Sequence, residues 1–247
     1  MIWRSILVLA ILAESTNPQP VLPPPPLPPV APALPLVHEV GPDEIAFKGI
    51  LLEKKRHRIS FPAMVNQRDG LIEYVLVQEN GKTHESLFST RVLPHDIHVA
   101  MLLIGLKEDD KGKSKETAPP SAIDSKYLQS APKLKGPPVL LSVTWTQGGK
   151  SREVPVEDWI FNLQTHHPMT RGWWVYNGSF VENGVFQADE ELSIVSVITD
   201  PTTLVNNPRS GYDNDQIWQV RTDSVPPMNT PVNINITLVE STPTTKP

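Results

Sequence analysis

The stretch Leu71-Ile-Glu-Tyr-Val-Leu-Val-Gln-Glu-Asn-Gly-Lys-Thr-His-Glu-Ser-Leu-Phe-Ser-Thr90 contains two runs of strand-forming residues separated by Asn80-Gly81. Aromatic and β-branched residues between turn-forming residues are typical of β-strands. Asn-Gly supplies the two positive φ values that a type I′ turn requires. The stretch therefore predicts an antiparallel β-hairpin with its turn at Asn80-Gly81.

Similar short segments continue on both sides of this stretch, and they predict a β-rich chain. Pro94 and Gly105 bracket a helix, because proline suits the first helical position and glycine the position after the last. Apolar residues surround this helix on most sides, so we expect it to be buried. A second helix is expected near 156–163. The predicted fold is α+β and β-rich, a single domain of about ten short, mostly antiparallel strands with one or two helices. Other strands are expected at 45–52, 58–61, 139–146, 151–156 (joined to the preceding strand by a turn at 147–150), 172–176, 185–187, 192–199, 216–221 and 232–239.

The first 35 residues differ in composition from the rest of the chain. Residues 1–13 place Arg4 before an apolar run, which predicts a secretory signal peptide cleaved near Glu14; an uncleaved anchor is the alternative. Residues 14–35 form a proline-rich linker, since ten of the eighteen positions from 18 to 35 are proline. We therefore expect an exported protein, periplasmic or extracellular.

Residues 36–240 form the expected globular domain. Residues 107–135 interrupt it with mixed charges and no periodicity, which predicts a mobile charged insertion. Residues 241–247 form a polar tail.

Composition excludes several classes of protein. The chain has no cysteine, which rules out disulfide frameworks and thiolate metal sites. A formal net charge of −5 with 22 Lys and Arg argues against nucleic acid as a partner. The expected partner is a protein or a component of the cell envelope, and contact with a membrane is expected only through an uncleaved signal.

Six blocks of the chain, in this order, resemble the YdjY-type domain family of exported bacterial proteins. Asn229 and Glu191 depart from the family pattern, both at turn positions where glycine is usual. The resemblance implies membership of a family without an established activity. The blocks are Gly81-Lys-Thr-His-Glu-Ser-Leu87, Ile97-His-Val-Ala-Met-Leu-Leu-Ile-Gly105, Trp174-Val-Tyr-Asn-Gly-Ser179, Phe186-Gln-Ala-Asp189, Asp200-Pro-Thr-Thr-Leu-Val-Asn-Asn-Pro208 and Val225-Pro-Pro-Met-Asn-Thr-Pro231.

Three histidines, His84, His95 and His98, are candidate ligands of a divalent transition metal, because imidazole is the usual ligand where thiols are absent. His95 and His98 share one flank of the predicted helix, and the short connection after the hairpin should hold them near His84. Glu85 would project from the opposite face of the hairpin and is a candidate ligand-binding residue. The alternative is that these side chains are ordinary half-buried polar residues.

Trp174 is a second candidate ligand-binding residue. Alternation along a strand places Trp173 and Trp174 on opposite faces, so at most one belongs to the core. The acidic and amide residues from Asp189 to Asp215 could bind calcium, or could simply form turns. No catalytic motif is present in the sequence. The predicted function is an exported, non-catalytic binding or interaction module; the alternative is a metal- or small-ligand-binding protein, which could be an enzyme, centred on the histidines.

Overall fold

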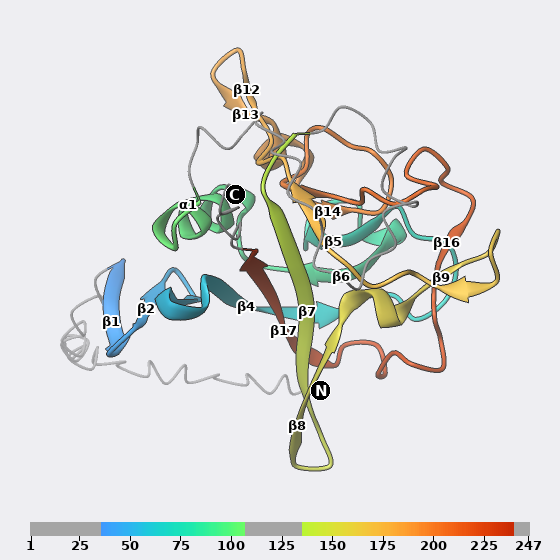
Figure 1. Ribbon diagram of the computed structural model, residues 1–247, viewed down its shortest axis with the longest axis horizontal. Coiled ribbons are helices and arrows are strands. Elements are labelled where there is room, and N and C mark those ends of the chain that lie inside the picture. Colours follow the sequence, from blue (N-terminus) through green and yellow to red (C-terminus); the bar gives the residue numbers. More distant parts are fainter. Residues whose placement is uncertain (1–35, 107–134, 240–247) are drawn as a thin grey trace, which may run out of the picture. The chain divides into compact units, whose positions relative to one another are not determined.

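The computed structural model describes residues 36–106 and 135–239 (Figure 1). The predicted signal peptide, linker and polar tail lie outside these residues, as does the predicted insertion except for Lys135.

Eight strands of the largest sheet close into a barrel. Each strand pairs with the next, and β6 returns to pair with β4 through Met64↔Ser89 and Val65↔Phe88. β17 lies between β4 and β7, with seven residue pairs to β4 and six to β7, and Figure 1 shows β7 and β17 side by side. In order around the barrel the strands are β4 (Arg58–Val65), β17 (Pro231–Leu238), β7 (Pro138–Gln147), β11 (Trp174–Tyr176), β15 (Val205–Asn206), β14 (Ser193–Ser196), β5 (Tyr74–Gln78) and β6 (Ser86–Thr90).

The remaining elements surround this barrel. β1 (Val37–Gly41), β2 (Glu44–Phe47) and β3 (Ile50–Glu53) extend the sheet from β4, and β8 (Lys150–Pro155) pairs with β7. Two smaller sheets contain β10 (His167–Pro168), β9 (Ile160–Asn162) and β16 (Trp218–Val220), and the hairpin of β12 (Val181–Glu182) and β13 (Val185–Phe186). The helices are α1 (Pro94–Leu103) and α2 (Gln187–Glu191); η1 (Lys54–Arg56), η2 (Thr83–Glu85) and η5 (Val156–Trp159) are single 3₁₀ turns.

The β-rich character and the two helices agree with the prediction, whereas the number of strands does not. Seventeen strands form within the described ranges, against the ten expected. Several of them, such as β10, β12 and β15, are only two residues long. Strands this short contain too few residues to show a period of two, so the sequence pattern misses them.

The barrel interior is filled by alternate side chains of its strands. In β4 the inward residues are Ile59, Phe61, Ala63 and Val65, all buried, and the residues between them are more exposed. This is the period of two that a strand with one buried face requires. Three tryptophans, Trp159, Trp174 and Trp218, are among the largest fully buried side chains.

The predicted hairpin at Asn80-Gly81 is wrong, because β5 and β6 are parallel. After β5 the chain runs back through η2, so that Tyr74 lies opposite Ser86 and Leu76 opposite Phe88. Every residue of β5 is buried. Strands that are buried on both faces are typical of parallel pairing, and the unbroken run from Tyr74 to Val77 is the sequence signal for it.

The position of the first helix was predicted correctly, and that of the second was not. α1 begins at Pro94 and ends at Leu103, close to the predicted limits. The second helix is not near 156–163, because the single turn η5 leads directly into β9 there. It is the short α2, which the sequence analysis missed because the residues around Val185 have a strand-like pattern. Neither helix of the described residues is long and apolar enough to cross a membrane.

Candidate functional site

The first turn of α1 is held by a carboxylate from a distant part of the chain. Leu93, at the cap position, offers no side-chain hydrogen bond. Instead, Asp189 of α2 accepts a hydrogen bond from the backbone N–H of His95 (3.0 Å), and its other oxygen lies 2.7 Å from His95 Nδ1. Nε2 of the same ring lies 3.1 Å from Asp96, which also pairs with Lys48 at 2.7 Å. His95 is thus placed between two carboxylates.

His98 occupies a separate environment on the same helix. Its Nδ1 lies 3.0 Å from the hydroxyl of Tyr176, and its ring stacks on Tyr176 and contacts Phe186. Burial raises the pKa of Tyr176, so its hydroxyl stays protonated in this hydrogen bond with the imidazole. His98 therefore joins α1 to β11 and β13.

His84 lies at the other end of β6. It belongs to η2, directly before β6, whereas His95 follows β6. A strand rises about 3.3 Å per residue, so the five residues of β6 set the two histidines about 13 Å or more apart. His84 borders an open hollow of about 430 Å³, together with Asn66, Gln67, Arg68, Asp69, Thr83 and Met228.

The predicted three-histidine site is not assembled. Across residues 36–106 and 135–239, no group of three or more His, Asp or Glu side chains could hold a metal ion. The physical reason is the extended strand between them: His84 precedes β6 and α1 follows it, so the five residues of β6 separate His84 from the helix histidines whichever way β6 pairs with β5. His84 and Glu85 also do not project oppositely, since His84 Nε2 lies 3.7 Å from Glu85 Oε2.

Trp174 is a core residue and not a surface for ligand binding. It is fully buried, while Trp173, which lies just before β11, is half-buried, so one of the two tryptophans belongs to the core. The indole N–H of Trp174 donates to Glu157 (3.0 Å), and the guanidinium of Arg209 lies 4.9 Å from its ring centroid. Arg209 and Glu157 form a buried ion pair at 2.7 Å. Burial raises the pKa of Glu157, and the charge of Arg209 opposes this shift.

Two of the acidic and amide residues that suggested calcium, Asp200 and Asn206, belong to an internal hydrogen-bond network. The side chain of Asn206 accepts from the backbone N–H of Asp200 (2.8 Å) and donates to Asn177 (2.7 Å). Asp200 in turn accepts from the hydroxyl of Tyr74 (2.9 Å), to which Lys82 donates (3.1 Å). These oxygens are already occupied by donors from the protein, which explains the residue types without a metal ion.

The sequence analysis missed Tyr74, Glu157 and Arg209. Arg209 and Glu157 are 52 positions apart and Tyr74 and Asp200 are 126 apart. No local pattern reports such contacts. The sequence gives only an indirect signal of these contacts: a tyrosine within an apolar strand and an arginine within a core segment. A polar group buried in a core needs a partner, so each of these residues implies one without identifying it.

Comparison with known proteins agrees with the resemblance of the six sequence blocks. A family model of the YdjY domain matches residues 50–237. No curated protein and no solved structure matches the chain. The matched residues run from β3 through all but the last residue of β17, which is more than half of the chain, and the chain therefore belongs to the YdjY domain family.

Proposed function

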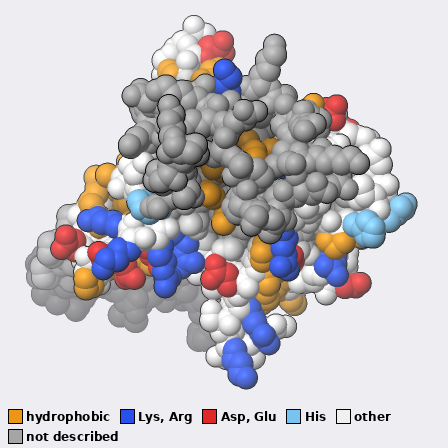
Figure 2. Space-filling view, viewed as in Figure 1, with side chains coloured by type: hydrophobic (Ala, Val, Ile, Leu, Met, Phe, Trp, Pro, Cys, Tyr) orange, Lys and Arg blue, Asp and Glu red, His pale blue; other side chains and the backbone are white. Residues whose placement is uncertain are grey.

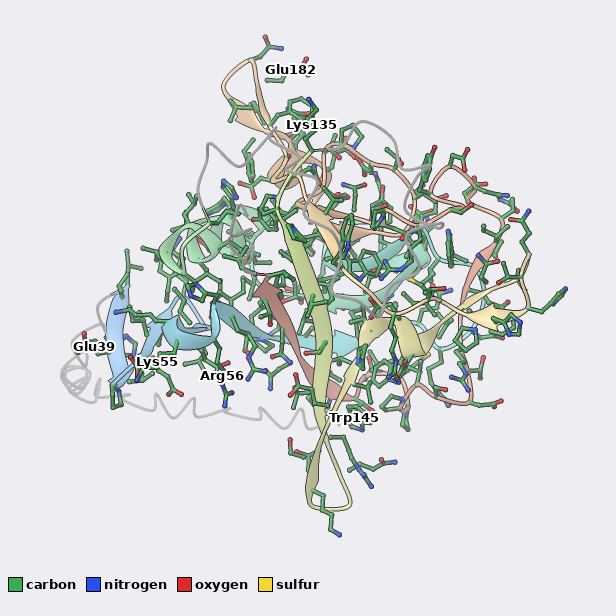
Figure 3. The ribbon with its side chains drawn as sticks, viewed as in Figure 1. Glu39, Lys55, Arg56, Lys135, Trp145 and Glu182 are labelled. Carbon is green, nitrogen blue, oxygen red and sulfur yellow. The ribbon has the colours of Figure 1, made fainter. Side chains whose placement is uncertain are left out.

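We propose that this protein is an exported, non-catalytic interaction module that contacts another protein through the β12–β13 hairpin. The observation that carries this proposal is the exposure of Phe180, Val181 and Val185 on a projection from the barrel, with Val181 at 65%. Figures 1 and 3 show the hairpin standing out from the other strands, with Glu182 at its outer end. Apolar side chains gathered on a projection are typical of protein-binding surfaces.

The state of the titratable groups supports a non-catalytic role. A tyrosine that acts as a base or a nucleophile needs a lowered pKa. Burial raises the pKa of Tyr74 to about 12, although the hydrogen bond from Lys82 acts in the opposite direction. His95 and Glu157 are likewise engaged by carboxylate and guanidinium partners inside the protein.

The distribution of charge favours a protein over a polyanion as the partner. Figure 2 shows blue and red side chains interspersed on the described part of one face. Several of them pair across elements, as Lys55 does with Asp43 and Arg58 with Glu153. Interspersed charges lack the continuous positive field that nucleic acids require.

Export rests on the sequence alone. The apolar run in residues 1–13 and the proline-rich residues 14–35 support it. Cells that export the protein should yield a mature chain beginning near Glu14, and intact-mass measurement reads this directly. A mass that retains residues 1–13 would favour an anchor.

Site-specific photocrosslinking tests the interaction surface. A photoreactive residue is introduced at Val181 in the full chain, expressed in the cells that produce it, with Ser151 on the exposed β8 as the matched position. A discrete adduct at 181 that is at least about tenfold stronger than at 151 is expected, because a specific interface contacts one patch. A Val185→Asp change should remove it. Equal labelling at both positions, or an adduct insensitive to Val185→Asp, would refute the hairpin as the contact.

A further inference from the structure

Asn183-Gly184 forms the turn at the tip of the β12–β13 hairpin. Asn183 has a φ of +51° and Gly184 a φ of +81°, which fits the type I′ turn that Asn-Gly favours. Both residues are exposed. Among the described residues, neither the side-chain amide of Asn183 nor the N–H of Gly184 has a hydrogen-bond partner. A Cβ at position 184 would meet no atom within 4 Å, so the reacting groups of the turn lie open to solvent.

We infer that Asn183 is a site of spontaneous covalent modification, at which the chain converts asparagine to aspartate and isoaspartate through a succinimide. A base removes the proton of the Gly184 N–H, and the nitrogen attacks Cγ of Asn183. The bond from Cγ to the side-chain nitrogen then breaks, ammonia leaves, and the succinimide ring is formed. Water adds to one of the ring carbonyls and opens the ring. Overall, one water is consumed, one ammonia is released, and a carboxylate replaces the amide.

The residue after the asparagine makes this reaction feasible. Glycine has no Cβ to shield its nitrogen, and its backbone rotates into the geometry of attack at little steric cost. The chain contains three Asn-Gly pairs, Asn80-Gly81, Asn177-Gly178 and Asn183-Gly184. All three have the same reacting groups, so a large difference in their rates must come from the fold.

The Asn177-Gly178 pair is held at both reacting groups. The N–H of Gly178 donates to the carbonyl oxygen of Leu204 at 3.0 Å. The side-chain amide of Asn177 donates to the carbonyl oxygen of Thr203 at 2.8 Å and accepts from the side chain of Asn206 at 2.7 Å. These bonds must break before the nitrogen can attack, and the fold must open locally for that to happen.

The Asn80-Gly81 pair is restrained at its glycine. The N–H of Gly81 donates at 2.8 Å to the carbonyl oxygen of Gln78, which is a buried residue. The place of a Cβ at position 81 lies only 3.0 Å from Leu192, so the backbone has little room to rotate. Asn183-Gly184 has neither of these restraints.

The strands behind the tip are short enough to let the turn change conformation. β12 and β13 share only two residue pairs. A two-stranded hairpin without further support is only marginally stable in water. The turn can therefore leave the type I′ geometry and bring the nitrogen of Gly184 to Cγ of Asn183.

The modification changes the hairpin in two ways. Both products add a negative charge next to Glu182, at the outer end of the hairpin (Figure 3). Isoaspartate also routes the main chain through the former side chain, which lengthens a turn that has room for two ordinary residues. The inference concerns the chemistry of the tip and does not depend on the contact proposed for this hairpin.

Peptide mapping by mass spectrometry tests the inference on the full chain aged in mildly alkaline buffer. Asn183 should convert at least about tenfold faster than Asn80 and Asn177, because only those two sites require local opening of the fold. In denaturant the three sites should convert at similar rates, since the fold no longer protects any of them. The two remaining Asn-Gly pairs thus serve as controls within the same molecule.

Asn183→Gln is the matched variant. Its longer side chain would have to close a larger ring, which forms far more slowly, so conversion at position 183 should be lost while the rates at Asn80 and Asn177 stay unchanged. Equal rates at the three sites of the folded chain would overturn the inference. Faster conversion of Asn80 or Asn177 than of Asn183 would overturn it as well, as would an Asn183 that stays intact in the folded chain while it converts in denaturant.

Discussion

Asp189 caps α1 from 94 positions farther along the chain, with one carboxylate oxygen on the backbone N–H of His95 and the other on its ring. The cap residue that the sequence provides, Leu93, cannot do this. The start of α1 is therefore stabilised only after α2 has been placed beside it. This makes the helix a part of the tertiary structure and not an independent element.

Removing this cap should destabilise the protein. Asp189→Ala is expected to lower the free energy of unfolding by about 1 to 2 kcal/mol, because the helix loses its N-terminal acceptor. Urea denaturation measures the change. Glu190→Ala, the exposed neighbour on α2, should change it by less than about 0.5 kcal/mol. Equal effects of the two substitutions would show that the cap does not contribute.

The buried ion pair should be far more sensitive than its exposed neighbour. Glu157→Ala leaves the guanidinium of Arg209 buried without its carboxylate and should cost about 3 to 5 kcal/mol. Asp158→Ala breaks the exposed pair with Arg171 at the next position and should cost about 1 kcal/mol or less. Denaturant titration of both variants gives the comparison. A loss for Glu157→Ala as small as that for Asp158→Ala would mean that water reaches Arg209.

Tyr74 should make the stability sensitive to alkaline pH. Burial raises its pKa from the ordinary 10.0 to about 12, so the folded state binds the hydroxyl proton more tightly than the unfolded state. The stabilisation is complete below pH 10 and is lost as the pH rises toward 12. Ultraviolet absorbance of tyrosinate should show a late transition that is smaller in Tyr74→Phe, because only Tyr176, whose pKa burial also raises, still contributes to it. Ionisation of every tyrosine near the ordinary value would contradict this.

Gly81 should be required for the close approach of another segment and not for the conformation of a turn. A Cβ at this position would lie 3.0 Å from both Cβ and the carbonyl oxygen of Leu192. Gly81→Asn, which a type I′ turn would accept, should therefore destabilise the protein by about 1 to 3 kcal/mol. Gly148→Asn is the control, since φ is +57° there and no atom lies within 4 Å. Thermal unfolding of the two variants measures the difference; equal midpoints would show that the contact with Leu192 does not restrict the residue at position 81.

The segment around Gly81 shows which features the sequence could predict and which it could not. Local signals predicted α1, the turn between β7 and β8, and β17. Asn80-Gly81 gave the correct end of β5 but the wrong direction for the next strand, because β6 also pairs with the distant β4 in the closed barrel, and two turn residues do not report such a pairing.

The candidate site failed for the same reason. His95 and His98 were correctly placed on one helix, yet their partners Asp189 and Tyr176 belong to elements that pack against α1 only in the finished fold. Residue type and spacing cannot report such partners. The resemblance of six ordered blocks identified the family better than any single motif, because it used the whole length of the domain.

The place of β17 determines when the chain can fold. It is the last strand along the described chain, yet it forms seven residue pairs with β4 near the beginning and six with β7. The ribosome makes these partners long before β17 exists, so the ring of strands cannot close during most of synthesis. Contacts between such distant segments also slow folding, since a long loop must close first. The nascent protein must therefore remain open, with β4 and β7 lacking the strand between them, until β17 itself has been synthesised.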